Sequence, residues 1–242
     1  MTQTLPATES SRLTALVAGA SGLVGGQLLE HLAAQPDFGR VIAVTRRPLQ
    51  SDLPRLANRI VRFEALEESL KGTRADVAFC ALGTTLDTAG SREAFRQVDF
   101  GVVLAFARAA REAGVQRFVL VSSIGADPAA NNFYLRVKGE TEQAVSGLGF
   151  AGLDIMQPGL LLGSRAELRP LELAARVVMP LVNLLLYGPV EQYRAIPASV
   201  VAAAMVGAAR SGRKGVHRYT HRDMRRLAQS LLRRGARVAS AA

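Results

Sequence analysis

The chain has 242 residues, 49% of them hydrophobic, so it can bury a sizeable core, and a disordered or fibrous protein is excluded. Its 30 Lys and Arg residues exceed its 20 Asp and Glu residues, giving a net charge of +10. Ten of the basic residues lie between 210 and 237, against one acidic residue, Asp223. That segment offers one aromatic residue, Tyr219, for base stacking, so nucleic-acid binding is not expected as the main function.

The cysteine count indicates the cellular compartment, and the length of the apolar runs indicates whether the chain crosses a membrane. A single cysteine, Cys80, excludes an internal disulfide, and we therefore expect a cytoplasmic protein. Residues 1–11 are polar, lack the features of a secretory signal and are expected to form a flexible tail. The longest uncharged stretch, 177–190, is interrupted by Pro180 and Gly188. It is shorter than the roughly 20 residues of a spanning helix, so no membrane span is expected.

Taken in chain order, the predicted elements alternate between strand and helix. Short apolar runs predict six strands, at 13–19, 40–44, 60–64, 75–83, 117–123 and 153–159. Helical spacing of apolar residues predicts helices at 23–35, at 92–114 and across Tyr134 and Lys138 to about residue 147. This alternation predicts an α/β fold with a Rossmann-like, doubly wound parallel sheet. Residues from about 160 to 242 are less regular and are expected to form a small C-terminal helical cap, so that 1–242 is a single domain.

The first predicted strand is followed by a glycine-rich turn, "GASGLVGG" at 19–26, which opens the first predicted helix. Gly19 suits a tight turn, Gly22 allows a close backbone approach to a pyrophosphate, and Gly25 lets the helix lie against the sheet. The backbone N–H groups at the helix start would bind the phosphates. The predicted phosphate-binding residues are Gly19, Ser21, Gly22, Leu23, Val24 and Gly25.

The end of the second predicted strand indicates which dinucleotide is bound. An NAD site usually has a carboxylate about 20 residues beyond the glycines, for the ribose 2′-hydroxyl. Here Thr45 stands at that place, followed by Arg46 and Arg47. Two guanidinium groups suit a 2′-phosphate, so the sequence predicts NADP(H) as the cofactor.

The fourth predicted strand ends in small residues, where the cofactor ribose would pass. We assign Ala81, Leu82, Gly83 and Thr84 to cofactor binding. Cys80, in the apolar run before them, is interpreted as a packing residue and not as a redox thiol. His217 and His221 stand four apart, but the chain has only three histidines in all, and no metal site is predicted.

Tyr134 and Lys138 stand four residues apart, and Ser122 and Ser123 end the preceding strand. In a doubly wound sheet these groups reach the same edge as the glycine turn. Reduction of a carbonyl needs a proton donor at the oxygen, and a neighbouring ammonium tunes a phenol for that exchange. Lys138 could also bind the nicotinamide ribose, and a serine hydroxyl could hold the substrate oxygen. An isolated Tyr–Lys pair could also be two solvated neighbours on a helix.

A series of segments resembles the atypical or extended short-chain dehydrogenases/reductases, especially the Tat-interacting-protein-like NAD(P)H-binding oxidoreductases. The segments are "GASGLVGG", "VTRRP", "FCALGTT", "RFVLVSSIGAD", "YLRVKGETE", "MQPGLLLG" and "YRAIPASVVAAAM". The resemblance implies a Rossmann fold, NADP(H), and a catalytic group of Tyr134, Lys138 and a serine. It favours Ser123 over Ser122, because the serine is usually the last of the run, and it places Pro158 beside the nicotinamide.

Two positions depart from the pattern of this family. Asp99 stands where many relatives have an asparagine that takes part in a proton relay, which puts that relay in doubt. Gln157 stands where sugar-nucleotide relatives often carry an arginine, which argues against epimerisation of nucleotide sugars.

Two functions are therefore expected as alternatives. The first is an NADP(H)-dependent oxidoreductase that reduces a small carbonyl compound, with Tyr134 as the proton donor. The second is a redox-sensing regulatory protein that binds NADP(H) and a protein partner with little turnover. The apolar segment 165–188 suits either a hydrophobic substrate pocket or a homodimer face, and the sequence does not distinguish them.

Overall fold

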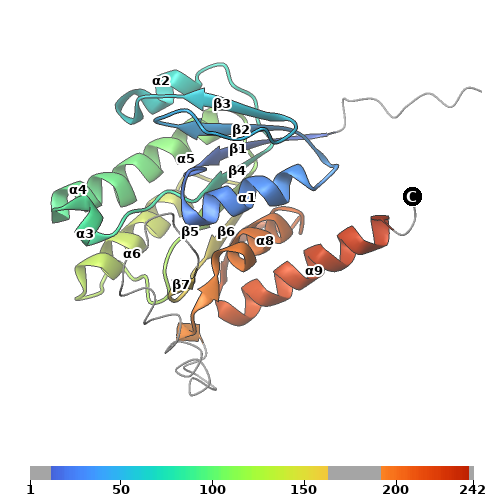
Figure 1. Cartoon of the computed structure of the whole chain (residues 1–242). Helices are drawn as coiled ribbons and strands as arrows, with labels where there is room; N and C mark the ends of the chain where they lie inside the picture. The colour runs from blue at the N-terminus through green and yellow to red at the C-terminus, as the bar shows by residue number, and fades with distance from the viewer. Residues whose placement is uncertain (1–11, 163–191, 240–242) are drawn as a thin grey trace, which may run out of the picture.

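A computed structural model describes residues 12–162 and 192–239 of the chain. The expected tail, 1–11, and the apolar segments 165–188 and 177–190 lie outside the described residues. The main feature is a seven-stranded sheet with the order β3-β2-β1-β4-β5-β6-β9, in which every neighbouring pair is parallel (Figure 1). This confirms the predicted Rossmann-like α/β fold.

The strands of this sheet are short, and all except the two edge strands lie between two neighbouring strands. They are β1 (Leu13–Ala18), β2 (Phe38–Thr45), β3 (Leu56–Ile60), β4 (Val77–Cys80), β5 (Arg117–Val121), β6 (Gly152–Met156) and β9 (Gly215–Tyr219). A separate two-stranded pair consists of β7 (Leu161–Leu162) and β8 (Ile196–Pro197). The helical elements are α1 (Leu23–Ala33), η2 (Phe63–Ala65), α2 (Leu66–Leu70), α3 (Leu86–Ala89), α4 (Arg92–Arg96), η3 (Gln97–Val102), α5 (Val103–Glu112), α6 (Phe133–Ser146), α8 (Ala198–Ala209) and α9 (His221–Ala239).

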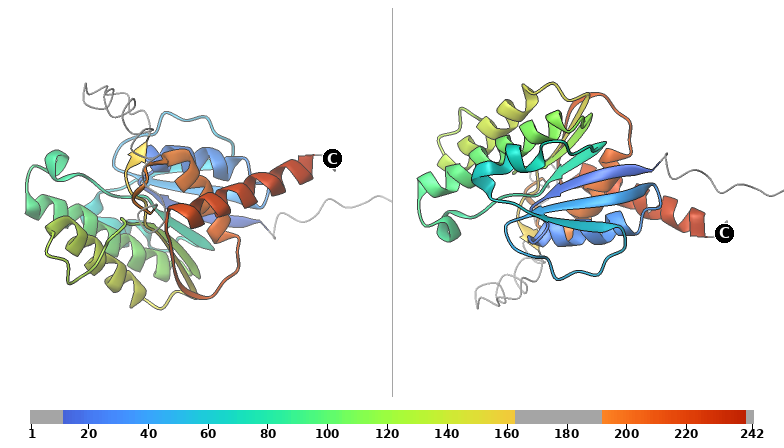
Figure 2. Two further views of the ribbon diagram at one scale, coloured as in Figure 1. Left: turned by 90° about the horizontal axis from the view of Figure 1, so that it is seen from below. Right: turned by 90° about the horizontal axis from the view of Figure 1, so that it is seen from above.

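Helices cover both faces of the sheet, as the two further views show (Figure 2). One core cluster joins α1, α8 and α9 to one face, and a second joins α2, α5 and the end of α6 to the other. The central strands are buried on both sides: all four residues of β4 and all five of β6 are buried. This explains why they read in the sequence as continuous apolar runs.

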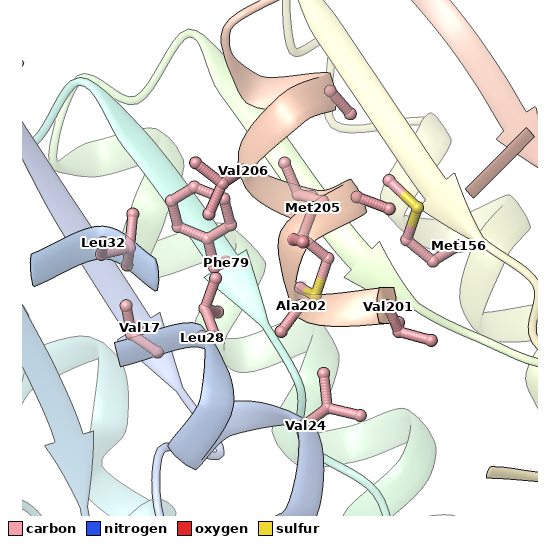
Figure 3. Packing of buried hydrophobic residues seen from close by; sticks show 14 of the residues in the cluster. Val17, Val24, Leu28, Leu32, Phe79, Met156, Val201, Ala202, Met205 and Val206 are labelled. Carbon is pink, nitrogen blue, oxygen red and sulfur yellow. The ribbon is translucent and has the colours of Figure 1, made fainter. Parts of the chain in front are cut away.

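In the first core cluster, α1 and α8 meet over the sheet (Figure 3). Val24, Leu28 and Leu32 of α1 pack beside Val201 and Met205 of α8. Beneath them lie side chains of β1, β4 and β6. This packing fixes the direction of α1, and therefore the position of the glycine turn at its start.

Three features differ from the prediction. The predicted strand 60–64 is displaced, because the third strand is Leu56–Ile60 and a short 3-10 turn follows at Phe63–Ala65. The predicted helix 92–114 contains a π-helical segment, η3. The C-terminal part supplies an edge strand, β9, and a helix, α8, that packs on the sheet. Both edge strands, β3 and β9, are largely solvent-accessible, so they lack the continuous buried apolar run of the central strands.

In the parts of the chain that the structure describes, no helix combines the length and apolar character needed to cross a bilayer.

Candidate functional site

The glycine turn between β1 and α1 has the tight geometry that the sequence predicted. Gly19 has a φ of +84°, and its carbonyl accepts the N–H of Gly22 at 2.9 Å. A Cβ at Gly25 would lie 2.0 Å from the carbonyl oxygen of Gly19, which no side chain could tolerate. Gly22 has no side chain to cap α1, and the first turn of the helix contains no acidic residue. The start of α1 therefore suits an anionic group.

The segment after β4 packs directly against this turn. A Cβ at Gly19 would lie 2.4 Å from the carbonyl carbon and oxygen of Ala81 and 2.7 Å from the nitrogen of Leu82. The Ala81 N–H donates to the carbonyl of Ala18, at the end of β1. The residues 81–84, which the sequence predicts to bind the cofactor and which we call the cofactor loop for that reason, thus adjoin the glycine turn. This is expected from two parallel strands that end side by side.

Arg46 and Arg47 follow the end of β2, and both are exposed. Val44 is the register partner of Ala18, so the two arginines leave the sheet beside the glycine turn. The guanidinium of Arg46 lies over the ring of Phe63, with its central carbon 5.3 Å from the ring centroid. The Thr45 hydroxyl donates to the Arg47 carbonyl at 2.7 Å and accepts from the side-chain amide of Asn58, which anchors this segment.

Helix α6 carries Tyr134 and Lys138 to the same edge of the sheet. Its N-terminus is capped by Asn132, whose side-chain oxygen accepts the N–H of Leu135. The Lys138 ammonium lies 6.0 Å from the centroid of the Tyr134 ring. Phe95 of α4 packs against the same ring, with centroids 5.5 Å apart. The pair is therefore held by packing and is not a solvated pair on an open helix face.

Lys138 is buried, and its ammonium forms an ion pair with Asp99. Lys138 Nζ lies 2.7 Å from Asp99 Oδ1, and the two side chains are 8% and 0% exposed. Asp99 Oδ2 also accepts the N–H of Thr84 in the cofactor loop at 2.9 Å. Burial alone would lower the pKa of Lys138, but the Asp99 carboxylate raises it, and the net pKa lies above the ordinary lysine value. Lys138 is therefore charged at neutral pH.

The two predicted serines have different surroundings. The buried Ser122 hydroxyl donates to Glu142 Oε1 at 2.6 Å. The half-buried Ser123 hydroxyl makes only a long contact, 3.4 Å, with the carbonyl of Ile124. The N–H of Ile124 in turn donates to the carbonyl of buried Pro158, which brings the predicted nicotinamide-side residue next to Ser123. Ser123 is the serine whose hydroxyl is the better placed to meet a ligand.

Sequence reasoning missed Glu142, which is the centre of a buried polar network. Its carboxylate accepts hydrogen bonds from Ser122, from Gln157 Nε2 at 2.8 Å and from Arg218 Nε at 2.8 Å. Glu142 stands four residues after Lys138 and eight after Tyr134, so the helical spacing was an available signal. Its partners follow the ends of β5 and β6 or lie on β9, and they could not be read from the sequence.

Glu142→Ala is expected to lower the free energy of unfolding by roughly 2–4 kcal/mol, because it leaves buried donors without an acceptor. Glu140→Ala is the matched control on the same helix, since its ion pair with Arg96 is partly exposed. That control should cost less than about 1 kcal/mol. Urea unfolding of both variants measures the difference, and equal losses would contradict this assignment.

Cys80 lies at the end of β4 and is completely buried. Burial raises the pKa of its thiol to about 12, so it is not a thiolate at neutral pH. This agrees with a packing role. Within the described residues no group of three or more His, Cys, Asp or Glu side chains is arranged to hold a metal ion.

Comparison with known proteins identifies the family to which this chain belongs. Residues 19–150 match a family described as NAD(P)H-binding, and they contain the glycine turn, the arginine pair and the Tyr134–Lys138 helix. The chain belongs to the NAD(P)H-binding family. It is also 36% identical over 201 residues to a protein of Aspergillus oryzae named fmp52-1, mitochondrial, covering 81% of this chain and 85% of that one. It is 40% identical over 165 residues to FMP52, mitochondrial, of Debaryomyces hansenii, covering 64% of this chain and 70% of that one.

Two solved structures of other proteins have the same overall architecture as this chain. A UDP-N-acetylglucosamine 4-epimerase from Methanobrevibacter ruminantium superimposes with a TM-score of 0.65 at 16% identity, covering 87% of this chain and 77% of that one. The Bordetella bronchiseptica enzyme WbmH, in complex with NAD+, gives 0.65 at 14% identity, with coverage of 87% and 76%. At these identities the likeness shows the fold alone. The narrower Tat-interacting-protein-like resemblance is not confirmed by these relatives.

The expected cytoplasmic location is wrong on this comparison, because the relatives at 34–40% identity are named as mitochondrial. A lone cysteine indicates only the absence of an internal disulfide, and it does not distinguish one reducing compartment from another.

Proposed function

We propose that this NAD(P)H-binding protein is an NADP(H)-dependent oxidoreductase that reduces a small carbonyl compound. The observation that carries the proposal is the packing of the glycine turn against the cofactor loop, with the Lys138 ammonium in contact with the same loop through Asp99. The residues proposed for dinucleotide binding and for proton transfer lie at one edge of the sheet, which supports a common site.

The residues present fit a dinucleotide. Gly19 and Gly25 have no space for a Cβ, because the turn packs closely on itself and on Ala81, which holds the start of α1 beside the end of β4. The N–H groups of Leu23 and Val24 would bind the pyrophosphate, with Ser21 at the rim. The N–H of Gly22 donates to the Gly19 carbonyl, so Gly22 would contribute a close backbone approach and not a hydrogen bond. The side chain of Val24 is in the core, so only its backbone is offered. Ala81, Leu82, Gly83 and Lys138 would bind the nicotinamide ribose side, next to Pro158.

When bound, the reduced cofactor supplies the hydride that is added to the carbonyl carbon. Tyr134 would give its phenolic proton to the carbonyl oxygen, so that the substrate leaves as an alcohol and the phenolate is later reprotonated from solvent. Ser123 would hold the carbonyl oxygen by a hydrogen bond. Lys138 would bind the ribose and act electrostatically on the phenol.

The choice of NADP(H) over NAD(H) rests on Arg46 and Arg47. Both are exposed at the end of β2, and the Arg46 guanidinium is oriented by the ring of Phe63. Charge-assisted hydrogen bonds to a phosphate are worth about 1.5–3 kcal/mol each. We therefore expect the Arg46→Ala, Arg47→Ala double variant to lose roughly 100-fold in NADPH affinity while NADH affinity changes little.

Calorimetric titration with NADPH, NADH and both oxidised forms tests this prediction. The matched control is Arg225→Ala with Arg226→Ala, an exposed pair on α9 whose removal lowers the net charge equally. Loss of NADPH affinity in both variants would mean that general charge is responsible. Absence of binding to all four nucleotides would overturn the proposed function.

A further inference from the structure

A cavity lies beside helix α6, lined by residues of that helix other than Tyr134 and Lys138. Its volume is about 390 Å³, within the range of roughly 300–1,000 Å³ that is typical of small-molecule sites. The lining residues come from the loop after β5, from α6 and from β9: Ala126, Asp127, Pro128, Gly139, Glu142, Gln143, Ser146 and Arg218. These residues differ from those proposed for catalysis and cofactor binding, so the cavity is a separate feature of the molecule.

One end of the cavity carries a fixed carboxylate, that of Asp127. A Cβ at Gly139 would lie 2.2 Å from the carbonyl carbon of Asp127 and 2.3 Å from the nitrogen of Pro128, so this loop lies directly against α6. Asp127 Oδ1 accepts the N–H of Ala129 at 2.7 Å, which orients the side chain. Asp127 is exposed, and its second carboxylate oxygen is therefore accessible to a ligand in the cavity.

The opposite charge comes from Arg218 on β9. Its Nε donates to Glu142 Oε2 at 2.8 Å, and the Arg218 side chain is 50% exposed, whereas that of Glu142 is 3% exposed. The other oxygen of Glu142 accepts from Ser122 and from Gln157, so this carboxylate is already used. The side-chain hydrogen bond of Arg218 to the described residues uses Nε alone, and a guanidinium has two further nitrogens that donate. Arg218 is thus held in place with its terminal nitrogens left for a ligand.

The two charged residues are spaced along α6. Asp127 lies against the helix at Gly139, and Arg218 is bonded to it at Glu142, three residues later. Three residues are nearly one helical turn, a separation on the order of 5 Å along the axis. A simple anion in the cavity would be repelled by the two carboxylates, and a simple cation would be repelled by the guanidinium. A ligand that carries both charges a few bonds apart complements both ends.

We propose that this cavity is a second binding site and that it takes a small zwitterion, such as a free α-amino acid. The ligand carboxylate would lie against the terminal nitrogens of Arg218, because a planar guanidinium can donate two parallel hydrogen bonds to a carboxylate. The ligand ammonium would lie against the Asp127 carboxylate. The exposed Gln143 amide and the Ser146 hydroxyl, which donates to the Glu142 carbonyl at 2.7 Å, line the same cavity and would contact polar atoms of the ligand side chain.

The first test titrates the full, nitrogen-15-labelled chain with each of the common L-amino acids and follows its NMR spectrum. At least one amino acid should shift the amide signals of 126–128, 139–146 and Arg218. The N-acetyl form of that amino acid lacks the ammonium and its amide form lacks the carboxylate, so each should bind at least about tenfold more weakly. The proposal is overturned if no amino acid shifts these signals. It is equally overturned if the N-acetyl form or inorganic phosphate binds as tightly as the amino acid, because the cavity would then be an anion site.

The second test removes one charge at a time. Asp127→Asn keeps an oxygen for the Ala129 N–H and should weaken the amino acid by roughly tenfold or more, while the N-acetyl form is unaffected. Asp52→Asn is the matched control, since it removes an exposed carboxylate from the loop before β3, at the other edge of the sheet. It should leave the affinity unchanged. Equal losses in both variants, or full affinity in Asp127→Asn, would contradict the proposal.

Arg218→Gln tests the carboxylate end, because a glutamine amide can still donate to Glu142. This variant should lose the preference for the amino acid over its amide form. If it does not fold, the comparison of Asp127→Asn with the N-acetyl form decides on its own. None of these titrations contains a dinucleotide, so the site and the proposed oxidoreductase function can fail independently.

Discussion

Tyr134→Phe is expected to lower kcat for carbonyl reduction by about 10²–10⁴-fold, because the variant lacks the proton that the carbonyl oxygen must receive. NADPH affinity should be unchanged, since the phenol is not assigned to cofactor binding. The ring contact with Phe95 is retained by phenylalanine, so folding should also be unaffected. Turnover of a carbonyl compound found by screening, followed by NADPH absorbance, measures the effect.

The matched control is Tyr193→Phe, which removes the hydroxyl of an exposed tyrosine remote in sequence from the α6 helix. It should leave kcat unchanged. Full activity in Tyr134→Phe would exclude the phenol as the proton donor. If the wild-type protein binds NADPH but turns over no carbonyl compound, and Tyr134→Phe keeps its partner binding, the regulatory alternative is favoured.

The second large effect is expected at Gly25 in the glycine turn. A methyl group there would lie 2.0 Å from the carbonyl oxygen of Gly19, 2.6 Å from its carbonyl carbon and 2.8 Å from Cα of Ala20. These are backbone atoms, so relief requires moving α1 away from the end of β1. We expect Gly25→Ala to lower the free energy of unfolding by about 1–3 kcal/mol or more and to abolish measurable NADPH binding.

Gly26→Ala is a stringent control, because it adds the same methyl group one residue later in the same helix. The nearest atom to that Cβ is the carbonyl oxygen of Ala20 at 3.9 Å, an ordinary contact. Since alanine favours a helix interior over glycine, this variant should be neutral or up to about 1 kcal/mol more stable. Thermal unfolding and calorimetry of both variants check the prediction, and equal behaviour would show that the close approach at Gly25 is not needed.

Much of the site was accessible from local sequence patterns. The spacing of the glycines, the arginines after the second strand and the four-residue step from Tyr134 to Lys138 each depend on geometry within one or two adjacent elements. Parallel strands that alternate with helices then bring those elements to a common edge. For this reason the glycine turn and the segment after β4 meet, although Gly19 and Ala81 are 62 positions apart in the sequence.

The ion pair of Asp99 and Lys138 and the network around Glu142 could not be read in the same way. Each depends on which side chains of separate elements face one another, and burial then decides whether a charge is paired or exposed. Asp99 was noticed in the sequence only as a departure from a pattern, whereas the structure gives it partners on two other segments. The edge strands β3 and β9 were misplaced or missed because half-exposed strands lack a strong apolar period.

The sequence by itself therefore determined the fold class, the glycine turn at the start of α1 and the placing of Tyr134 and Lys138 one turn apart on a helix, since all three follow from periodicity and short-range backbone geometry. The tertiary structure alone decided that Lys138 forms an ion pair with Asp99 and that the Ser122 hydroxyl donates a hydrogen bond to Glu142. It also decided that β9 is an edge strand of the sheet. These depend on contacts between residues far apart in the chain, whose energies arise only when folding removes the groups from water.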